Sequence, residues 1–231
     1  MQMRFSLSET IRYCLDSDVV IFLDVRKHQY FCYDGELREK FYTLTQCNFG
    51  AAIPVELREF AEHLTHAGII RVAIDEHDRI APTPNEVAHG SIFDNDELRG
   101  IRLSFRSARQ IFVAALECSW LLHSKDLIEI SNRLEQWKRQ TASEPESDGN
   151  AVSSIISGFL DAAPWFLTVK DQCLYRSLLL VRYLSLRKIS ADWIVGVRYD
   201  PFRAHCWVER NGVILNDHLE NVLAYKKILV I

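Results

Sequence analysis

The sequence lacks the spacings that mark a structural zinc site. Its six cysteines form no CxxC pair, and no histidine pair stands at zinc-finger spacing. A signal peptide is not expected, because Arg4 and other polar residues precede any apolar run. The longest apolar runs, such as Ile111–Leu116, are too short to span a bilayer. We therefore expect a cytoplasmic protein with free thiols and no membrane span.

Two further absences narrow the function classes. Neither GxxxxGK[ST] nor GxGxxG occurs, so the chain has no recognisable ATP site of its own. Basic residues are not in excess, since the formal net charge is −4. Residues 1–90 carry 9 Lys/Arg against 14 Asp/Glu, a net of −5, whereas residues 91–231 carry 18 against 17, a net of +1. Nucleic-acid binding, which needs a basic face, is therefore not expected.

What is present is an ordinary globular composition. The 231 residues are 48% hydrophobic and 25% charged, which indicates folded domains with a sizeable core. Residues 83–100 are polar and rich in turn formers, and we place a boundary there. The sequence thus predicts one domain over residues 1–85 and a second over residues 95–231.

The N-terminal domain is predicted to begin with a hairpin. Val19–Asp24 and Gln29–Asp34 are rich in β-branched and aromatic residues and flank a short polar turn. Two or three helices follow, among them Pro54–Gly68 with apolar residues at helical spacing. Ile69–Ile74 and Arg79–Pro82 are expected to form a second small hairpin. This order predicts a small winged-helix-like domain.

The C-terminal domain is predicted to place helices before strands. Ser104–His123 is apolar on most faces, which predicts a core helix. The full set of expected helices is Ser104–His123, Lys125–Gln140, Ala151–Leu160 and Asp171–Lys188, and the expected strands are Ala191–Arg198, Arg203–Glu209 and Val213–Asn216. The fold class is therefore α+β, with helices packed on a small antiparallel sheet.

The last sixty residues contain the sharpest chemical signal. Cys173 stands at a predicted helix start, where the helix dipole and free amide groups favour a thiolate. His205 lies in a predicted strand and could hold the proton of that thiol. Asp217 ends the next strand and could orient the imidazole. The backbone N–H groups of the helix start, and the side chain of Gln172, are candidate donors to an oxyanion.

The hairpin between these strands provides a geometric test. A two-residue turn at Asn211-Gly212 would place His205 opposite His218 and point Asp217 to the other face. A three-residue loop, with Gly212 in the left-handed conformation, would place His205 opposite Asp217 on the same face. A Cys-His-Asp triad therefore predicts the three-residue, bulged loop.

Each of these residues taken alone is most often structural. A cysteine at a helix start is usually a small buried residue, and an aspartate at a strand end is usually a turn former. Cys206 follows His205 and alternates to the opposite strand face, so we expect it in the core. His63 and His66 stand three apart on a predicted helix, but no cysteine or carboxylate accompanies them, so no metal site is expected.

The segment from Cys173 to Asp217 resembles the transglutaminase-like cysteine peptidase domain of lasso peptide biosynthesis, the microcin-processing leader peptidase. The matching residues form a D-x-C-L-x-R-S-L helix, an A-H-x-W-V-E strand and an N-D pair, at Asp171–Leu178, Ala204–Glu209 and Asn216-Asp217. The resemblance implies a transglutaminase/papain-like fold for residues 95–231. It implies that Cys173 is the nucleophile, His205 the base and Asp217 the orienting acid.

The N-terminal third resembles, through its order of hairpin, helices and a Gly-Ile-Ile exit, the peptide-recognition (PqqD-like) domain of these pathways. The resemblance implies that a leader peptide adds a strand to the small sheet and packs against a helix. Phe22, Tyr30 and Phe31 are the candidate leader-binding residues, and Trp207 is a candidate wall of the substrate cleft. The implied partners are a precursor peptide and an asparagine-synthetase-like lasso cyclase. No cofactor is expected to bind directly, since ATP dependence would come through that cyclase.

The sequence therefore predicts a cytoplasmic leader peptidase that cuts a ribosomally made precursor through a cysteine thioester before macrolactam closure. Three alternatives stay open. The same triad could transfer an acyl group to an amine, as transglutaminases do. The chain could be a peptide-binding scaffold with a vestigial site, or a DNA-binding regulator.

Overall fold

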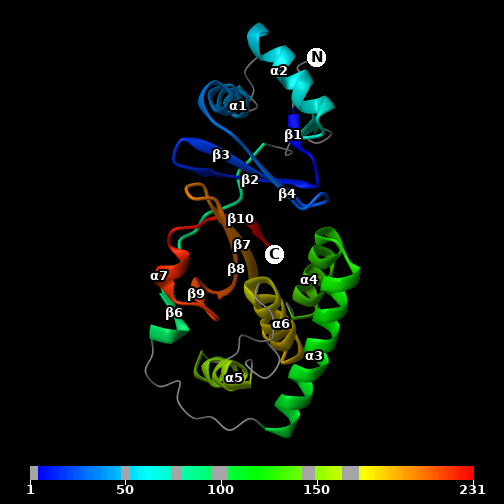
Figure 1. Cartoon of the computed structure of the whole chain (residues 1–231), viewed down its shortest axis with the longest axis vertical. Coiled ribbons are helices and arrows are strands. Elements are labelled where there is room, and N and C mark those ends of the chain that lie inside the picture. Colours follow the sequence, from blue (N-terminus) through cyan, green and yellow to red (C-terminus); the bar gives the residue numbers. More distant parts are fainter. Residues whose placement is uncertain (1–4, 48–52, 74–79, 95–103, 142–148, 163–171) are drawn as a thin grey trace. The chain divides into compact units, whose positions relative to one another are not determined.

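The computed structural model describes residues 5–47, 53–73, 80–94, 104–141, 149–162 and 172–231 (Figure 1). The chain divides into two compact units. Unit 1 contains Met1–Pro84 together with Tyr199–Pro201, and unit 2 contains Asn85–Arg198 together with Phe202–Ile231. No helix in the described part of the chain is long and apolar enough to cross a membrane.

In the described part of unit 1, a three-stranded antiparallel sheet in the order β2-β3-β4 is combined with two helices and a separate strand pair. The predicted hairpin over Val19–Asp34 is confirmed, because β3 and β4 pair with Phe22 opposite Phe31. Every residue of β3 is buried, as expected for an apolar central strand. The elements are β1 (Phe5–Leu7), β2 (Ile11–Asp16), β3 (Val19–Asp24), β4 (Gln29–Tyr33), α1 (Gly35–Cys47), α2 (Val55–His66) and β5 (Ile70–Val72).

The core of unit 1 is a cluster of aromatic rings between the sheet and the helices. Phe22 is 0% exposed and stacks on Phe31 with ring centroids 4.8 Å apart. Phe41 of α1 meets the edge of the same ring at 5.0 Å, and Tyr33 meets it from β4 at the same distance. The helices are thus held to the sheet by buried aromatic area.

The second small hairpin expected in unit 1 is not observed. β5 pairs with β1, placing Ile70 opposite Leu7, instead of pairing with the segment near Pro82. This pairing places Phe5 and Ile70 in the aromatic core, and Ile80 of the expected second strand lies in the same core without forming a strand. Residues 74–79 lie outside the described residues. A winged-helix form is therefore not shown for this unit.

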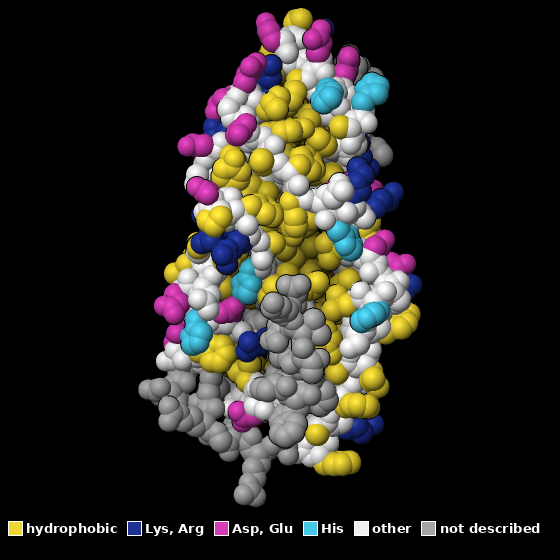
Figure 2. Space-filling model, viewed as in Figure 1, with side chains coloured by type: hydrophobic (Ala, Val, Ile, Leu, Met, Phe, Trp, Pro, Cys, Tyr) yellow, Lys and Arg dark blue, Asp and Glu magenta, His cyan; other side chains and the backbone are white. Residues whose placement is uncertain are grey.

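The acidic character of the N-terminal third is visible on the surface. In the face shown in Figure 2, acidic side chains gather around α1 and α2. Glu36 and Glu39 of α1, and Glu56, Glu59 and Glu62 of α2, are all exposed.

The described residues of unit 2 form four long helices and a five-stranded sheet in the order β10-β7-β8-β9-β6. The pairs are antiparallel except for β6 with β9. The predicted order of helices followed by strands is confirmed, and so is a fold of mixed helix and sheet. The elements are β6 (Gly90–Ser91), the 3-10 turn η1 (Ile92–Asp94), α3 (Phe105–Ser124), α4 (Leu127–Thr141), α5 (Gly149–Ala162), α6 (Gln172–Leu186), β7 (Asp192–Arg198), β8 (Arg203–Arg210), β9 (Val213–Ile214), α7 (Leu219–Val222) and β10 (Lys226–Val230).

The central helix of unit 2 is α6. Its residues from Ser177 to Leu180 are completely buried, so the helix packs on all sides there. Ser177 accepts a hydrogen bond from the indole N–H of Trp193 on β7 at 2.8 Å, which fixes the helix to the sheet. Trp193 is itself 0% exposed, so it packs in the core and does not line a cleft.

Helix α3 differs from the core helix predicted for Ser104–His123. Ile111, Ala114 and Cys118 are completely buried, but Phe112 and Leu116 are more than half exposed. The apolar residues on several faces of α3 therefore do not all lie in the core.

Candidate active site

Cys173 is the second residue of α6 and its side chain is half-buried. A thiol in the first turn of a helix lies near unpaired backbone N–H groups and the positive end of the helix dipole. Both favour the thiolate over the thiol. The helix start predicted from the sequence is therefore observed.

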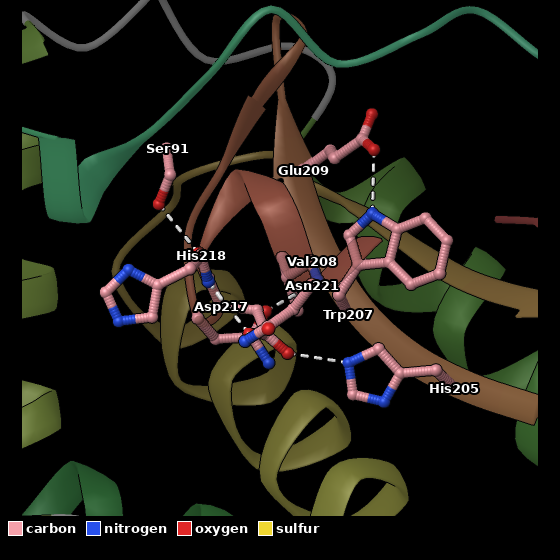
Figure 3. Close-up of polar contacts among 9 residues, drawn as sticks. Ser91, His205, Trp207, Val208, Glu209, Asp217, His218 and Asn221 are labelled. Carbon is pink, nitrogen blue, oxygen red and sulfur yellow. Dashed lines mark hydrogen bonds and ion pairs between the residues drawn. The ribbon is translucent and has the colours of Figure 1, made fainter. Parts of the chain in front are cut away.

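His205 of β8 and Asp217 are joined by a hydrogen bond of 2.6 Å between Nε2 and Oδ2 (Figure 3). The other carboxylate oxygen of Asp217 accepts the Asn221 amide at 2.7 Å and the backbone N–H of His218 at 2.8 Å. Ser91 of β6 donates to the backbone carbonyl of Asp217 at 2.7 Å. Asp217 is thus fixed from three elements, and Nδ1 of His205 remains for Cys173.

The loop between β8 and β9 is not the one that the triad predicts. Arg210 pairs with Val213 across a two-residue turn. Asn211 and Gly212 have φ angles of 52° and 73°, the left-handed values of a type I′ turn. The prediction of a three-residue, bulged loop is therefore wrong.

A bend after β9 compensates for this turn. The N–H of Leu215 donates to the Val208 carbonyl at 2.8 Å, as in a continued strand pair. The N–H of Val208, however, donates to Oδ1 of Asn216 at 2.8 Å, where a regular ladder would use the Leu215 carbonyl. The chain bends over residues 215–217. Asp217, which the unbroken register would turn away, reaches His205 in this way.

The ionisable groups of the site shift one another. Hydrogen bonds from the Cys206 thiol and from His205 lower the pKa of Cys173 to about 4, although burial raises it. Burial lowers the pKa of His205, but the hydrogen bonds and charges of Asp217 and Cys173 outweigh burial and raise it to about 9. Burial raises the pKa of Asp217, but hydrogen bonds from His205, Asn221 and His218 outweigh burial. The pKa of Asp217 is therefore lowered.

The pKa of Cys173 is lowered and that of His205 is raised, and these opposite shifts favour a thiolate–imidazolium pair at neutral pH. In such a pair the thiolate is a charged nucleophile, and the imidazolium beside it is an acid that can donate a proton. The arrangement is suited to attack on a carbonyl carbon followed by proton donation to a leaving group.

The chain matches the family model described as Transglutaminase-like superfamily over residues 112–230, just over half of its length. This protein belongs to the transglutaminase-like superfamily. The match includes Cys173, His205 and Asp217. No solved structure matches the chain significantly.

The transglutaminase-like chain is also similar to the microcin J25-processing protein McjB of Escherichia coli. The two are 46% identical over 48 residues, which is 21% of this chain and 23% of that relative. The matched segment thus spans less than a quarter of either chain.

Trp207 supports His205 of this transglutaminase-like site from within the core. Its ring lies 6.0 Å from the His205 ring, and Tyr225 lies 5.5 Å from the same ring. Trp207 is only 1% exposed, and its indole N–H donates to Glu209 at 2.7 Å. Lys227 pairs with the other oxygen of Glu209 at 2.6 Å. Trp207 therefore does not form the predicted wall of a substrate cleft.

The other predicted site residues fall into two groups. Phe22 is completely buried in the core of unit 1, so its side chain is not available to a bound peptide. Tyr30 and Phe31 are partly exposed on β4. Gln172 is the first residue of α6, but its side chain lies outside the described part, and so does its predicted oxyanion role.

Sequence reasoning missed four residues that position the site. Ser91, Asn216 and Asn221 act on the segment around Asp217, and Cys206 acts on Cys173. In the sequence, Asn216 stands out only as part of the N-D pair with Asp217. Ser91 lies 126 positions from Asp217, and no sequence signal links them.

Within the described residues, no group of three or more His, Cys, Asp and Glu side chains could hold a metal ion. His66 hydrogen-bonds through Nδ1 to the Glu62 carbonyl of its own helix at 2.9 Å.

Proposed function

We propose that this protein is a cysteine leader peptidase of lasso peptide maturation. In this proposal it binds the leader of a precursor peptide and cuts the leader from the core before a partner cyclase closes the macrolactam. The observation that carries the proposal is the Cys173–His205–Asp217 group, in which Cys173 at the start of α6 hydrogen-bonds with His205, and His205 hydrogen-bonds with Asp217 at 2.6 Å.

The reaction would proceed through a thioester. The Cys173 sulfur attacks the carbonyl carbon of the last leader residue, and backbone N–H groups of the α6 start stabilise the oxyanion. His205 gives its proton to the leaving amine, which becomes the N-terminus of the core. His205 then takes a proton from water, and the hydroxide attacks the thioester carbonyl, which releases the leader acid and restores the Cys173 thiolate beside the His205 imidazolium.

Asp217 would act through His205. Its hydrogen bond at Nε2 directs Nδ1 towards Cys173 and stabilises the imidazolium that donates the proton. Asn221 and the His218 N–H hold the carboxylate in that orientation. These contacts favour the ionised form of Asp217, which the role requires.

Similarity supports the peptide substrate. The chain belongs to the transglutaminase-like superfamily, and its partial relative is named for processing a microcin. The Cys173–His205–Asp217 group would therefore act in processing a peptide precursor. Because the relative is matched over 23% of its length, its substrate is carried over only as part of this proposal.

Unit 1 would bind the leader along β4. The β2 edge of its sheet is partly covered, because the N–H of Thr83 donates to the Tyr13 carbonyl at 2.9 Å. Strand β4, in contrast, pairs within the described residues with β3 alone. A leader strand added to β4 would lie beside Phe31 and Tyr33, whose ring is 6.3 Å from Phe60 of α2. Main-chain hydrogen bonds would supply affinity and these rings specificity.

The proposal assigns ATP to a partner. An asparagine-synthetase-like cyclase would use ATP to activate a side-chain carboxylate of the core, and the amine released by cleavage would then close the ring. The cleavage derived above needs no nucleotide, since Cys173, His205 and water supply every group that reacts.

The decisive experiment incubates the full chain with its precursor peptide and reads the products by mass spectrometry. The wild-type protein is expected to yield two shortened peptides whose masses sum to the precursor plus one water. Cys173→Ala is expected to leave the precursor intact while still binding a synthetic leader. Full leader removal by Cys173→Ala would overturn the peptidase proposal and support a scaffold.

A second function, acyl transfer, is favoured by the membership in the transglutaminase-like superfamily. The same thioester would then be attacked by an amine. The mass spectrum distinguishes the two reactions, because transfer joins the acyl group to that amine and releases no leader acid. A retained leader carrying a crosslink would replace the hydrolysis proposal.

A further inference from the structure

Cys206 lies against the sulfur of Cys173 from the strand that also carries His205. It is buried, with 8% of its surface exposed, as its alternation on β8 predicts. Its role in the core is not only packing, since both its thiol and its backbone N–H form hydrogen bonds with Cys173. Two donors of one residue thus converge on one sulfur.

The open edge of β8 explains why the backbone N–H is available. Cys206 faces Val195 of β7, and the N–H of Val208, two residues later, points away from β7 to Asn216. In a strand, N–H groups two residues apart point to the same side, so the N–H of Cys206 also points away from β7. The bend over residues 215–217 removes the strand that would pair there. The backbone hydrogen bond of Cys206 to Cys173 uses this free side of the strand.

The protonation states suit donation from Cys206 to Cys173. The hydrogen bond with Cys173, together with burial, raises the pKa of Cys206 well above its ordinary value, so Cys206 keeps its proton. The charged group that acts on Cys173 within the described residues is His205, backed by Asp217. Cys206 is therefore a neutral donor beside an ion pair.

We propose that Cys206 is a positioning residue that holds the Cys173 sulfur as a thiolate against β8 through its thiol and its backbone N–H. The inference rests on the proposed function, in which Cys173 is the nucleophile. Donors that stabilise a thiolate increase its share at low pH and also reduce its intrinsic nucleophilicity. Cys206 thus extends the reaction to lower pH and moderates the rate of the ionised sulfur.

This trade-off has a signature that packing does not produce. The alkylation rate of Cys173 should rise with pH as the thiolate forms, which is the acid limb, and then reach a plateau. Loss of the Cys206 thiol should move this acid limb to higher pH and leave the plateau rate equal or higher. A packing defect should instead lower the plateau and leave the limb in place. The backbone N–H remains in every variant, so the shift is expected to be partial.

The test is the pH dependence of Cys173 alkylation by iodoacetamide in the full chain, read by mass spectrometry on the Cys173 peptide. Cys206→Ala and Cys206→Val make the residue smaller and larger, and both remove the donor. Each is expected to move the acid limb upward by about one pH unit or more, which lowers the alkylation rate about tenfold at a pH well below the new limb. Cys206→Ser keeps a hydroxyl donor and is expected to shift the limb less than either.

Cys118→Ala is the matched control, because Cys118 is a completely buried thiol of α3 in the same unit. Its acid limb should coincide with that of the wild type. Thermal unfolding identifies any variant that does not fold. If Cys206→Ala or Cys206→Val does not fold, the other one, or Cys206→Ser, is compared with the wild type.

An acid limb that coincides in wild type, Cys206→Ala and Cys206→Val would overturn the inference, and so would a lowered plateau with an unmoved limb. A wild-type limb near about 8.5, the ordinary value of a cysteine thiol, would instead count against the proposed function itself. The two failures are therefore distinguishable.

Discussion

Asn216 accepts the N–H of Val208 at 2.8 Å and thereby ends the strand pairing one step before Asp217. A side-chain amide occupies the place of a backbone carbonyl, so the chain can bend without leaving a buried N–H unpaired. The bend is what turns Asp217 to the face of His205. One hydrogen bond therefore connects the hairpin to the geometry of the candidate active site.

Asn216→Ala should be destabilising and should also lower activity. Val208 is 0% exposed, so its N–H would lose its acceptor inside the protein, at roughly 1–3 kcal/mol in the free energy of unfolding. Asp217 would lose its fixed position, and leader cleavage should fall. Asn221→Ala is the control, because Asn221 is exposed and its loss removes one bond to Asp217 without burying an unpaired group. Urea unfolding that ranks the two variants equally would contradict this account.

Cleavage should have a bell-shaped pH profile. The thiolate forms as pH rises through about 4, the pKa of Cys173, and the imidazolium is lost as pH rises through about 9, the pKa of His205. kcat/KM should therefore rise on the acid side and fall on the basic side. Alkylation of Cys173 should rise on the same acid limb but stay high above pH 9, because the thiolate persists there. A single limb in the cleavage profile would show that His205 is not the acid.

Asp217→Asn should separate the two effects of Asp217 on His205, namely the orientation of the imidazole and the negative charge beside it. The asparagine can still contact His205, but it removes the carboxylate whose hydrogen bond and charge raise the pKa of His205. The basic limb of the profile should move to lower pH, and kcat should fall by roughly 10²- to 10⁴-fold. Circular dichroism checks that the fold is kept. A variant with wild-type kcat and an unmoved basic limb would remove Asp217 from the mechanism.

Gly196→Ala should disrupt the support of His205. Gly196 lies opposite His205 in the β7–β8 pair, and an added Cβ would stand 2.4 Å from the Trp207 ring. Because Trp207 is held by Glu209 in the core, the ring cannot move away without breaking that bond. We expect the free energy of unfolding to fall by about 1–3 kcal/mol and the melting temperature to fall with it.

Gly158→Ala of α5 is the matched control for Gly196→Ala. An added Cβ there meets nothing within 4 Å, and alanine in a helix interior stabilises by roughly 0.5–1 kcal/mol relative to glycine. The two variants should therefore change the melting temperature in opposite directions. A shared fall would mean that the Trp207 contact is not the cause.

Local sequence patterns predicted much of the secondary structure. The β-branched and aromatic run Val19–Asp24 forms a buried central strand, and the apolar run after Asp171 forms the buried helix α6. Cys173 was expected at the start of that helix, where it is observed. These features follow from propensity and hydrophobic period, which depend on neighbouring residues.

Pairing choices were harder to predict. β5 pairs with β1, about 65 positions away, because both strands bury apolar residues in one aromatic core. The turn at Asn211-Gly212 has two residues, as its composition favours, although the triad alone predicts three. The surface of α3 keeps Phe112 and Leu116 exposed, which periodicity alone did not separate from a core helix.

The sequence by itself determined the residue types of the site, their order and the elements that carry them, because helix starts and strands are local properties of the chain. Only the tertiary structure decided that Asp217 faces His205, since that depends on the Asn216 side chain completing the ladder at Val208. It also decided that Cys206 contacts Cys173. The bend leaves the edge of β8 open, and the first turn of α6, more than thirty residues earlier in the chain, packs there. Such contacts arise from packing between distant segments, and no local pattern encodes them.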